Sequence, residues 1–160
     1  ILSKWQKVKK LYFFEDNSNI YGIKIIYLPG HTDDEVGFII NDRIMITGDL
    51  ISSRERYELP SLNTPCADID KTIRTLELIR KLNPEIVYTG HGSPIYELGY
   101  FIEKAISKTN ELLFLAKKLY REYGLEVRFF RKLYKSLPDE FHTQIKLSLL
   151  GILLRKCLRR

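Results

Sequence analysis

The strongest constraint on the fold is the order of strand-like and helix-like segments between residues 36 and 88. Two short apolar segments, 36–40 and 44–47, are separated by turn residues and predict a β-hairpin. Residues 69–82 then repeat apolar side chains at helical spacing, and a short buried strand is expected at 85–88. The order strand, helix, strand predicts an α/β layered architecture.

The segments on either side extend this pattern. Strands at 10–14 and 21–28, rich in Ile, Tyr and Phe, flank turn residues and predict an earlier hairpin. After residue 98 the apolar spacing becomes helical throughout. Three helices are expected there: one that begins near Leu98 and stops at Gly124, one at 127–137, and one at 139–158.

Charge divides the chain in the same way. Residues 1–99 carry a net charge of −2, whereas residues 100–160 carry +8. We therefore expect two units with different roles, an α/β unit over 1–98 and a helical unit over 99–160. A basic surface attracts polyanions such as RNA, but it also keeps a protein soluble. Charge alone therefore leaves nucleic-acid binding open.

Composition excludes several classes of protein. With 44% hydrophobic and 29% charged residues, the chain is expected to be globular rather than disordered. Cys66 and Cys157 match no zinc-finger spacing and favour a cytoplasmic protein with reduced thiols. The longest apolar stretch, 147–154, is shorter than the ~20 residues that span a membrane. The first ten residues do not read as a signal peptide. No membrane partner is expected.

Three residues carry the chemistry of the α/β unit. His31 and His91 lie in glycine-flanked loops directly after predicted strands, where functional side chains collect. Antiparallel pairing of the hairpin should bring His31 and Asp49 to one edge of the sheet, and His91 joins them if strand 85–88 ends there. Two imidazoles and a carboxylate suit Zn²⁺ or another first-row metal. Each residue taken singly is more often structural, so the prediction depends on the combination.

The order of these residues resembles the metallo-β-lactamase superfamily. Pro-Gly-His-Thr at 29–32, Thr-Gly-Asp at 47–49 and Tyr-Thr-Gly-His-Gly at 88–92 are similar to its third, fourth and fifth motifs. Further similarity, to the beta-lactamase-like protein 2 subfamily, lies in residues 29–34, 90–95 and 133–142. The resemblance extends over nearly the whole chain.

The resemblance implies a two-zinc hydrolase. In that family His31 would ligate the first zinc, Asp49 would bridge both, and His91 would ligate the second. It implies that residues 1–98 are the C-terminal half of an αββα metallo-β-lactamase sandwich. Residues 99–160 would then form a helical, winged-helix-like domain. The subfamily is similar to endoribonucleases that act on single-stranded RNA, and more distant relatives hydrolyse thioesters such as acylglutathiones.

The sequence departs from the family pattern in two ways. The first motif of the family, His-x-His-x-Asp-His, supplies four further metal ligands. It is absent here, because the three histidines of the chain are residues 31, 91 and 142 and form no such cluster. Glu35 stands where a histidine is frequent in the family. We expect the chain to be a fragment, a split-gene product or a decayed copy, with an apolar sheet face left exposed. A partner chain or a missing N-terminal half would complete the sandwich, and activity of this chain alone stays open.

Six basic residues are candidates for RNA contact. They are Lys104, Lys108, Lys117 and Lys118 on the long helix, and Arg155 and Lys156 near the C-terminal end of the chain. A solvated helix end is the simpler interpretation of the last two. Three functions remain: a zinc-dependent endoribonuclease on single-stranded RNA, a thioesterase of the hydroxyacylglutathione hydrolase type, and a non-catalytic remnant that binds RNA or a partner.

Overall fold

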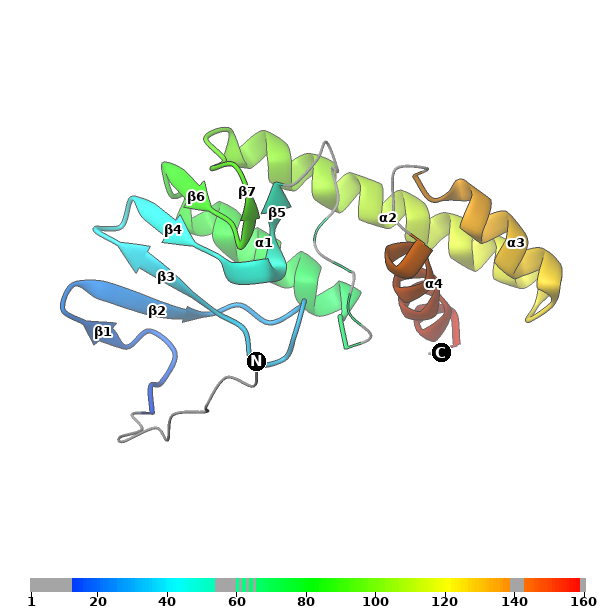
Figure 1. The fold of residues 1–160 in the computed structure, drawn as a ribbon, viewed down its shortest axis with the longest axis horizontal. Helices are drawn as coiled ribbons and strands as arrows, with labels where there is room; N and C mark the ends of the chain where they lie inside the picture. The colour runs from blue at the N-terminus through cyan, green and yellow to red at the C-terminus, as the bar shows by residue number, and fades with distance from the viewer. Residues whose placement is uncertain are drawn as a thin grey trace, which may run out of the picture.

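The computed structural model describes residues 13–53, 60, 62, 64, 66–138 and 143–158. Within these residues, five strands form one sheet in the order β1-β2-β3-β4-β6 (Figure 1). They are β1 (Asn19–Ile20), β2 (Ile23–Tyr27), β3 (Val36–Ile40), β4 (Ile44–Ile46) and β6 (Ile86–Tyr88). Neighbouring strands are antiparallel except β4 and β6, which are parallel. The predicted α/β class is confirmed.

The β3–β4 hairpin lies where the sequence predicts it. Its turn residues Asn41 and Asp42 have φ angles of 52° and 55°, in the left-handed region that asparagine and aspartate adopt more readily than most residues. The first hairpin differs from the prediction. Its turn is Tyr21-Gly22, and Asn19, which was expected in a turn at residues 16–19, pairs with β2 instead. The predicted strand at 10–14 lies outside the described residues except for Phe13 and Phe14, which are exposed and not in a strand.

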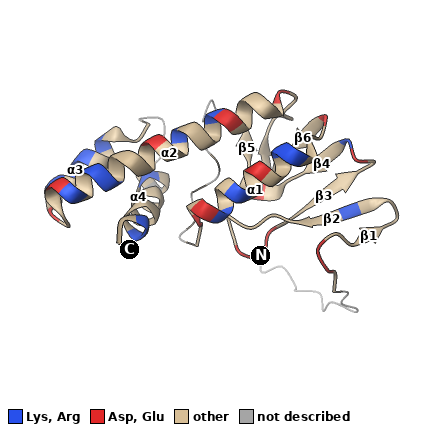
Figure 2. Ribbon diagram, turned by 180° about the vertical axis from the view of Figure 1, so that it is seen from behind, with Lys and Arg blue, Asp and Glu red and all other residues tan. Residues whose placement is uncertain are grey.

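Helix α1 (Ile69–Leu82) covers one face of the sheet, and α2 (Leu98–Tyr123) runs beside it (Figure 2). The Asp68 carboxylate caps α1 by accepting the backbone N–H groups of Asp70 and Lys71. Asn83 ends the helix in the left-handed conformation. Leu76 and Ile79 of α1 are fully buried and pack in one core with sheet residues that include Met45.

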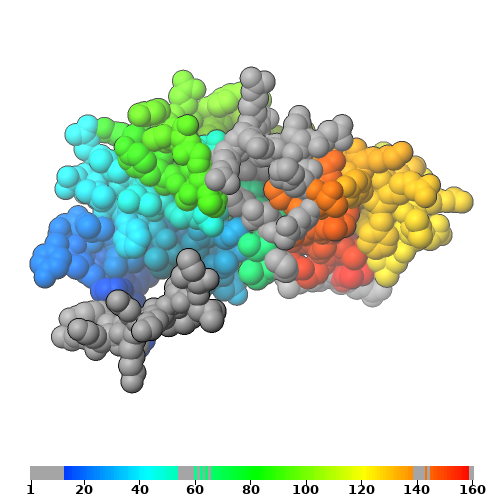
Figure 3. Space-filling model, in the orientation of Figure 1, coloured from blue at the N-terminus to red at the C-terminus, as the bar shows by residue number. Residues whose placement is uncertain are grey.

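The other face of the sheet is apolar and exposed. Residues of β2, β3, β4 and β6 alternate between the two faces, because successive strand residues point to opposite sides. Six apolar side chains that point away from α1 are 37–44% exposed: Ile23, Tyr27, Val36, Phe38, Ile46 and Tyr88. Figure 3 shows atoms of β2, β3 and β4, coloured blue to cyan, at the molecular surface. The expected exposed apolar face is therefore present, and we call it the open sheet face.

The remaining helices are α2 (Leu98–Tyr123), α3 (Val127–Ser136) and α4 (Thr143–Leu158). Helix α2 contributes to two cores. Its first half, including Ile102, packs with the sheet and α1, whereas its second half, including Ala116, packs with α3 and α4. The division at 98/99 stays a prediction, since one helix serves both sides of it. No strand follows residue 92 among the described residues, so a wing also stays a prediction. None of the described helices is long and apolar enough to cross a membrane.

Candidate metal centre

Asp49 and His91 meet at one edge of the sheet because β4 and β6 run parallel and end there together. Beyond the strands, the Gly90 backbone N–H donates to the Gly48 carbonyl over 2.6 Å. Asp49 lies on the short 3₁₀ turn η1 (Gly48–Leu50), and His91 begins β7 (His91–Gly92), which pairs with β5 (Ser52–Ser53). The His91 Nε2 atom lies 3.5 Å from Asp49 Oδ1, and both side chains are about half exposed. The predicted juxtaposition of these two residues is observed.

Gly90 makes this juxtaposition possible. A Cβ atom built on Gly90 would overlap Asp49 Oδ1 and lie 2.8 Å from the Gly48 carbonyl oxygen. Any larger residue would therefore push the η1 turn away from the turn that carries His91. The carboxylate of Asp49 occupies a cradle that exists because residue 90 has no side chain.

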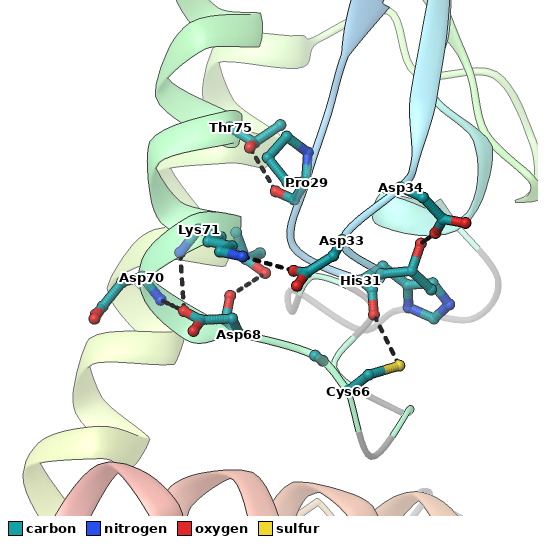
Figure 4. Close-up of polar contacts among 12 residues, drawn as sticks. Pro29, His31, Asp33, Asp34, Cys66, Asp68, Asp70, Lys71 and Thr75 are labelled. Atoms are coloured by element: carbon teal, nitrogen blue, oxygen red, sulfur yellow. Dashed lines mark hydrogen bonds and ion pairs between the residues drawn. The ribbon is translucent and has the colours of Figure 1, made fainter. Parts of the chain in front are cut away.

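The loop that carries His31 is held against α1 (Figure 4). The Thr75 hydroxyl donates to the Pro29 carbonyl over 2.6 Å, and the Asp68 backbone N–H donates to the Gly30 carbonyl over 2.9 Å. A Cβ atom on Gly30 would lie 2.7 Å from the Thr72 Cα, so the loop approaches the helix backbone as closely as glycine permits. The loop is thus positioned by the first turns of α1.

His31 itself is buried, at 8% exposure. Its carbonyl accepts the Thr64 hydroxyl over 2.8 Å, and in Figure 4 its imidazole extends away from α1. Within the described residues, no three His, Cys, Asp or Glu side chains form a group that could hold a metal ion. The structure therefore brings Asp49 and His91 together and leaves His31 on the neighbouring loop.

Glu35 connects these two parts of the site, and its sequence position alone did not predict a role for it. Its Oε1 atom accepts the backbone N–H of Leu50 over 2.8 Å. Burial raises the pKa of the Glu35 carboxyl, and the Asp49 carboxylate adds to this. The N–H groups of Leu50 and Asp49 and the charge of a protonated His31 act in the opposite direction. Glu35 is thus within electrostatic reach of predicted ligands on both loops.

The donor atoms at this edge fit a divalent metal ion. Asp49 and His91 offer a carboxylate oxygen and an imidazole nitrogen, which Zn²⁺ and other first-row metals accept. Their partial exposure leaves room for an ion to approach. The Glu35 Oε2 atom is buried and has no hydrogen-bond partner among the described residues. These residues supply part of a coordination sphere; metal binding by His31, Asp49 and His91 stays a prediction.

The six candidate RNA-binding residues fall into two groups. Lys104, Lys117 and Lys118 are exposed on α2, where Lys108 lies 3.4 Å from Glu111 (Figure 2). Arg155 and Lys156 contact the start of α1 instead. Arg155 donates to the Ala67 carbonyl over 3.5 Å, and Lys156 forms an ion pair with Asp70. These last two residues help to hold α4 against α1, and RNA contact by all six stays a prediction.

Comparison with known proteins agrees with this geometry. Residues 7–91, more than half of the chain, match the family model of the Metallo-beta-lactamase superfamily. The chain therefore belongs to the metallo-beta-lactamase superfamily, a family whose fold binds divalent metals. The resemblance inferred from the motifs is confirmed.

Individual relatives are similar over part of their length. The chain is 23% identical over 121 residues to the Beta-lactamase-like protein 2 homolog of Drosophila melanogaster, covering 73% of this chain and 39% of that protein. It is 31% identical over 96 residues to the Probable metallo-hydrolase YqjP of Bacillus subtilis (strain 168), covering 54% and 29%. The chain thus spans less than half the length of these relatives.

Two solved structures share the fold. The metallo-beta-lactamase family protein TTHA1429 from Thermus thermophilus superposes with a TM-score of 0.62 at 16% identity, covering 89% of this chain and 48% of that one. A Beta-lactamase domain protein from Burkholderia ambifaria superposes with a TM-score of 0.58 at 11% identity, covering 94% and 48%. At these identities the likeness shows the fold alone.

Proposed function

We propose that this chain is part of a metal-dependent hydrolase, in which His31, Asp49 and His91 contribute to a two-zinc centre. The observation that carries the proposal is the Asp49–His91 pair, closed over Gly90 at the end of two parallel strands. Zinc supplies a Lewis acid that lowers the pKa of bound water to ~7. The chain's own residues anchor that centre at an exposed edge, which a substrate can reach.

The open sheet face supports a second part of this proposal. Sheets in layered α/β proteins normally have both faces covered, and large exposed apolar patches mark contact surfaces. Phe38, Ile46 and Tyr88 lie in one row across β3, β4 and β6 on that face. We propose that a second β-layer, from further sequence of the same protein or from a partner chain, covers this face and supplies the remaining ligands.

Single-stranded RNA is the substrate that the surface of α2 supports best. Lys104, Lys117 and Lys118 are exposed there, beside the aromatic rings of Tyr100 and Phe114. The Lys104 ammonium lies 5.4 Å from the centre of the Tyr100 ring, and Phe114 is 72% exposed. Cations interleaved with exposed aromatic rings suit the phosphates and bases of a single strand.

We propose the cytoplasm as the compartment of this protein, since Cys66 and Cys157 are free thiols.

Cleavage of labelled single-stranded RNA by the protein in its full natural length tests the activity. We expect cleavage that a chelator abolishes and added zinc restores, and that His91→Ala removes. Asp42→Asn is the matched control, because Asp42 is an exposed carboxylate in the turn at the other end of the same hairpin. Acylglutathione is assayed with the same preparation.

Each outcome separates the candidate functions. Chelator-sensitive turnover of acylglutathione without RNA cleavage would replace the ribonuclease with a thioesterase. Absence of both activities in a preparation that binds RNA would identify a non-catalytic binding protein. Replacing Lys104, Lys117 and Lys118 together by Gln should weaken RNA binding and reduce the slope of affinity against salt concentration. Unchanged binding would remove α2 from the proposal.

A further inference from the structure

Glu35 is the last loop residue before β3, and its side chain reaches the turn that carries Asp49. Glu35 Oε1 accepts the Leu50 backbone N–H over 2.8 Å. The same oxygen approaches Gly48 so closely that a Cβ atom there would lie 2.8 Å from it. Gly48 has a φ of 60°, which aims the η1 turn toward the carboxylate. One carboxylate thus connects the end of the His31 loop to the Asp49 turn.

Both predicted ligands act on the charge of this carboxylate. Burial raises the pKa of the Glu35 carboxyl, the charge of a protonated His31 opposes this rise, and the Asp49 carboxylate adds to it. The Asp49 backbone N–H also acts on the carboxylate, in addition to that of Leu50. Asp49 therefore meets Glu35 through its backbone, which leaves the Asp49 side chain turned toward His91.

The second carboxylate oxygen of Glu35 has no obvious structural task. Oε2 is buried and accepts no hydrogen bond from the described residues. A buried polar atom without a partner costs free energy, so such an atom in a native fold calls for a donor or a cation. Among the groups that act on the charge of Glu35, His31 is the one side chain that can carry a positive charge.

A histidine that ligates a metal donates its second ring N–H in nearly every case, and a carboxylate is a common acceptor. That hydrogen bond fixes the ring orientation and decides which nitrogen faces the metal. Glu35 directly follows the His31 loop and offers a buried carboxylate oxygen that has no partner among the described residues. It does so while holding the Asp49 turn through its other oxygen.

We propose that Glu35 is a positioning residue of the metal centre. One oxygen fixes the Asp49 turn, and the other accepts the ring N–H of His31 while the opposite ring nitrogen faces the metal. The inference rests on the proposed metal centre and adds to it a residue that brings the His31 loop and the Asp49–His91 edge into one site. A carboxylate that only capped the η1 turn would serve the fold without affecting the metal.

Zinc affinity, measured by competition with a chromophoric chelator on the full-length protein, separates the two roles. In Glu35→Gln the amide oxygen can still accept from Leu50, but the amide NH₂ cannot accept from His31. We expect Glu35→Gln to weaken zinc binding by about 10–100-fold, the range for groups that orient metal ligands. Glu35→Asp should fall between it and the wild type. Asp34→Asn is the matched control, since Asp34 is the adjacent exposed carboxylate, and should bind zinc like the wild type.

Thermal denaturation of the metal-free variants supplies the contrasting readout. A lower Tm for Glu35→Gln with zinc affinity equal to the wild type would overturn the inference, because Glu35 would then serve the fold alone. A wild type that binds no zinc would instead overturn the proposed function and this inference with it. The two failures are therefore distinguishable.

The tautomer of His31 gives a second measurement that does not depend on the variants folding. Ring ¹⁵N shifts of the zinc-loaded wild type should show His31 with one nitrogen protonated and the other bound to metal. The protonated nitrogen should correlate with a slowly exchanging hydrogen. A His31 ring whose protonated nitrogen exchanges freely with solvent would overturn the inference.

Discussion

The two parts of the candidate site are built by different means. The His31 loop is held from outside by α1, through Thr75, Asp68 and the Lys71–Asp33 ion pair at 2.7 Å. The Asp49–His91 edge is held from within the sheet, by parallel strands and a backbone contact between residues 48 and 90. The loop buries its histidine, whereas the edge leaves both side chains half exposed.

This difference predicts how each part of the site responds to substitution. A substitution at the loop should act through the packing of α1 and therefore disturb stability and metal binding together. A substitution at the edge should act on ligand geometry first, because the side chains of Asp49 and His91 are half exposed. The open sheet face lies beside both parts of the site, so a further layer on that face would enclose both of them.

Gly90→Ala is expected to have the largest effect on metal binding. The new Cβ would overlap the Asp49 carboxylate, so Asp49 and His91 could not occupy their present positions together. We expect zinc affinity to fall by roughly 100-fold, the upper end for changes that displace metal ligands. Chelator competition measures it. Gly99→Ala is the control, because nothing lies within 4 Å of its Cβ position and alanine favours a helix. Equal affinities of Gly90→Ala and wild type would remove the edge from the site.

Gly30→Ala tests the loop. Its Cβ would lie 2.6 Å from the Thr72 Oγ1 and 2.7 Å from the Thr72 Cα, both in the first turn of α1. We expect a loss of ~1–3 kcal/mol in the free energy of unfolding, as for overpacked sites, together with weaker zinc binding. Urea denaturation of the metal-free protein measures the first. A variant as stable as the wild type would show that α1 does not hold the loop.

Asp68→Ala is a smaller change that also tests how α1 positions the His31 loop. It removes the cap of α1, whose loss typically costs ~0.5–2 kcal/mol, and leaves the Gly30 contact in place because that contact uses the Asp68 backbone. Urea denaturation should show the loss, with zinc affinity changed less than in Gly30→Ala. Zinc binding that falls as far as in Gly30→Ala would mean that the cap, rather than the close glycine contact, positions His31.

The elements that the sequence predicted well are those specified by local signals. The β3–β4 hairpin has turn residues that adopt positive φ readily, and α1 has a capping aspartate at one end and Asn83-Pro84 at the other. The first hairpin was misplaced because its turn puts Tyr21 at a φ of 52°, a conformation that tyrosine rarely adopts. Residues 52–53 were missed as a strand because they pair with residues 91–92, far away in sequence.

The residues of the candidate site also divide into those that local sequence signals predict and those that depend on tertiary contacts. The sequence placed His91 beside Asp49 on the condition that strand 85–88 ends at the same edge, and the parallel pairing of β4 and β6 meets that condition. Glu35 was not predictable, because its role depends on where the η1 turn places two backbone N–H groups. Its one sequence signal was that an acidic residue stands directly before the β3–β4 hairpin, which Asp49 follows. The contacts of Arg155 and Lys156 with α1 depend on helix packing, which residue spacing within α4 does not encode.

Glu85→Gln is expected to have the smallest effect and tests the other end of the same strands. Arg43 and Glu85 form a two-pronged, exposed ion pair between the β3–β4 turn and the start of β6, with distances of 2.7 and 2.6 Å. The Arg43 guanidinium lowers the pKa of Glu85 below its unfolded value, and exposed pairs of this kind contribute little. A lowered folded-state pKa means that the contribution is present above the unfolded pKa and lost as pH falls through the folded one.

The wild type should therefore lose this small advantage over Glu85→Gln in acid and in high salt, as urea titrations at several pH values would show. Zinc affinity should not change, because the pair lies at the edge opposite Asp49 and His91. A change in zinc affinity would mean that the two ends of these strands are coupled. The edge could then no longer be regarded as a site held locally by the turns at residues 48 and 90.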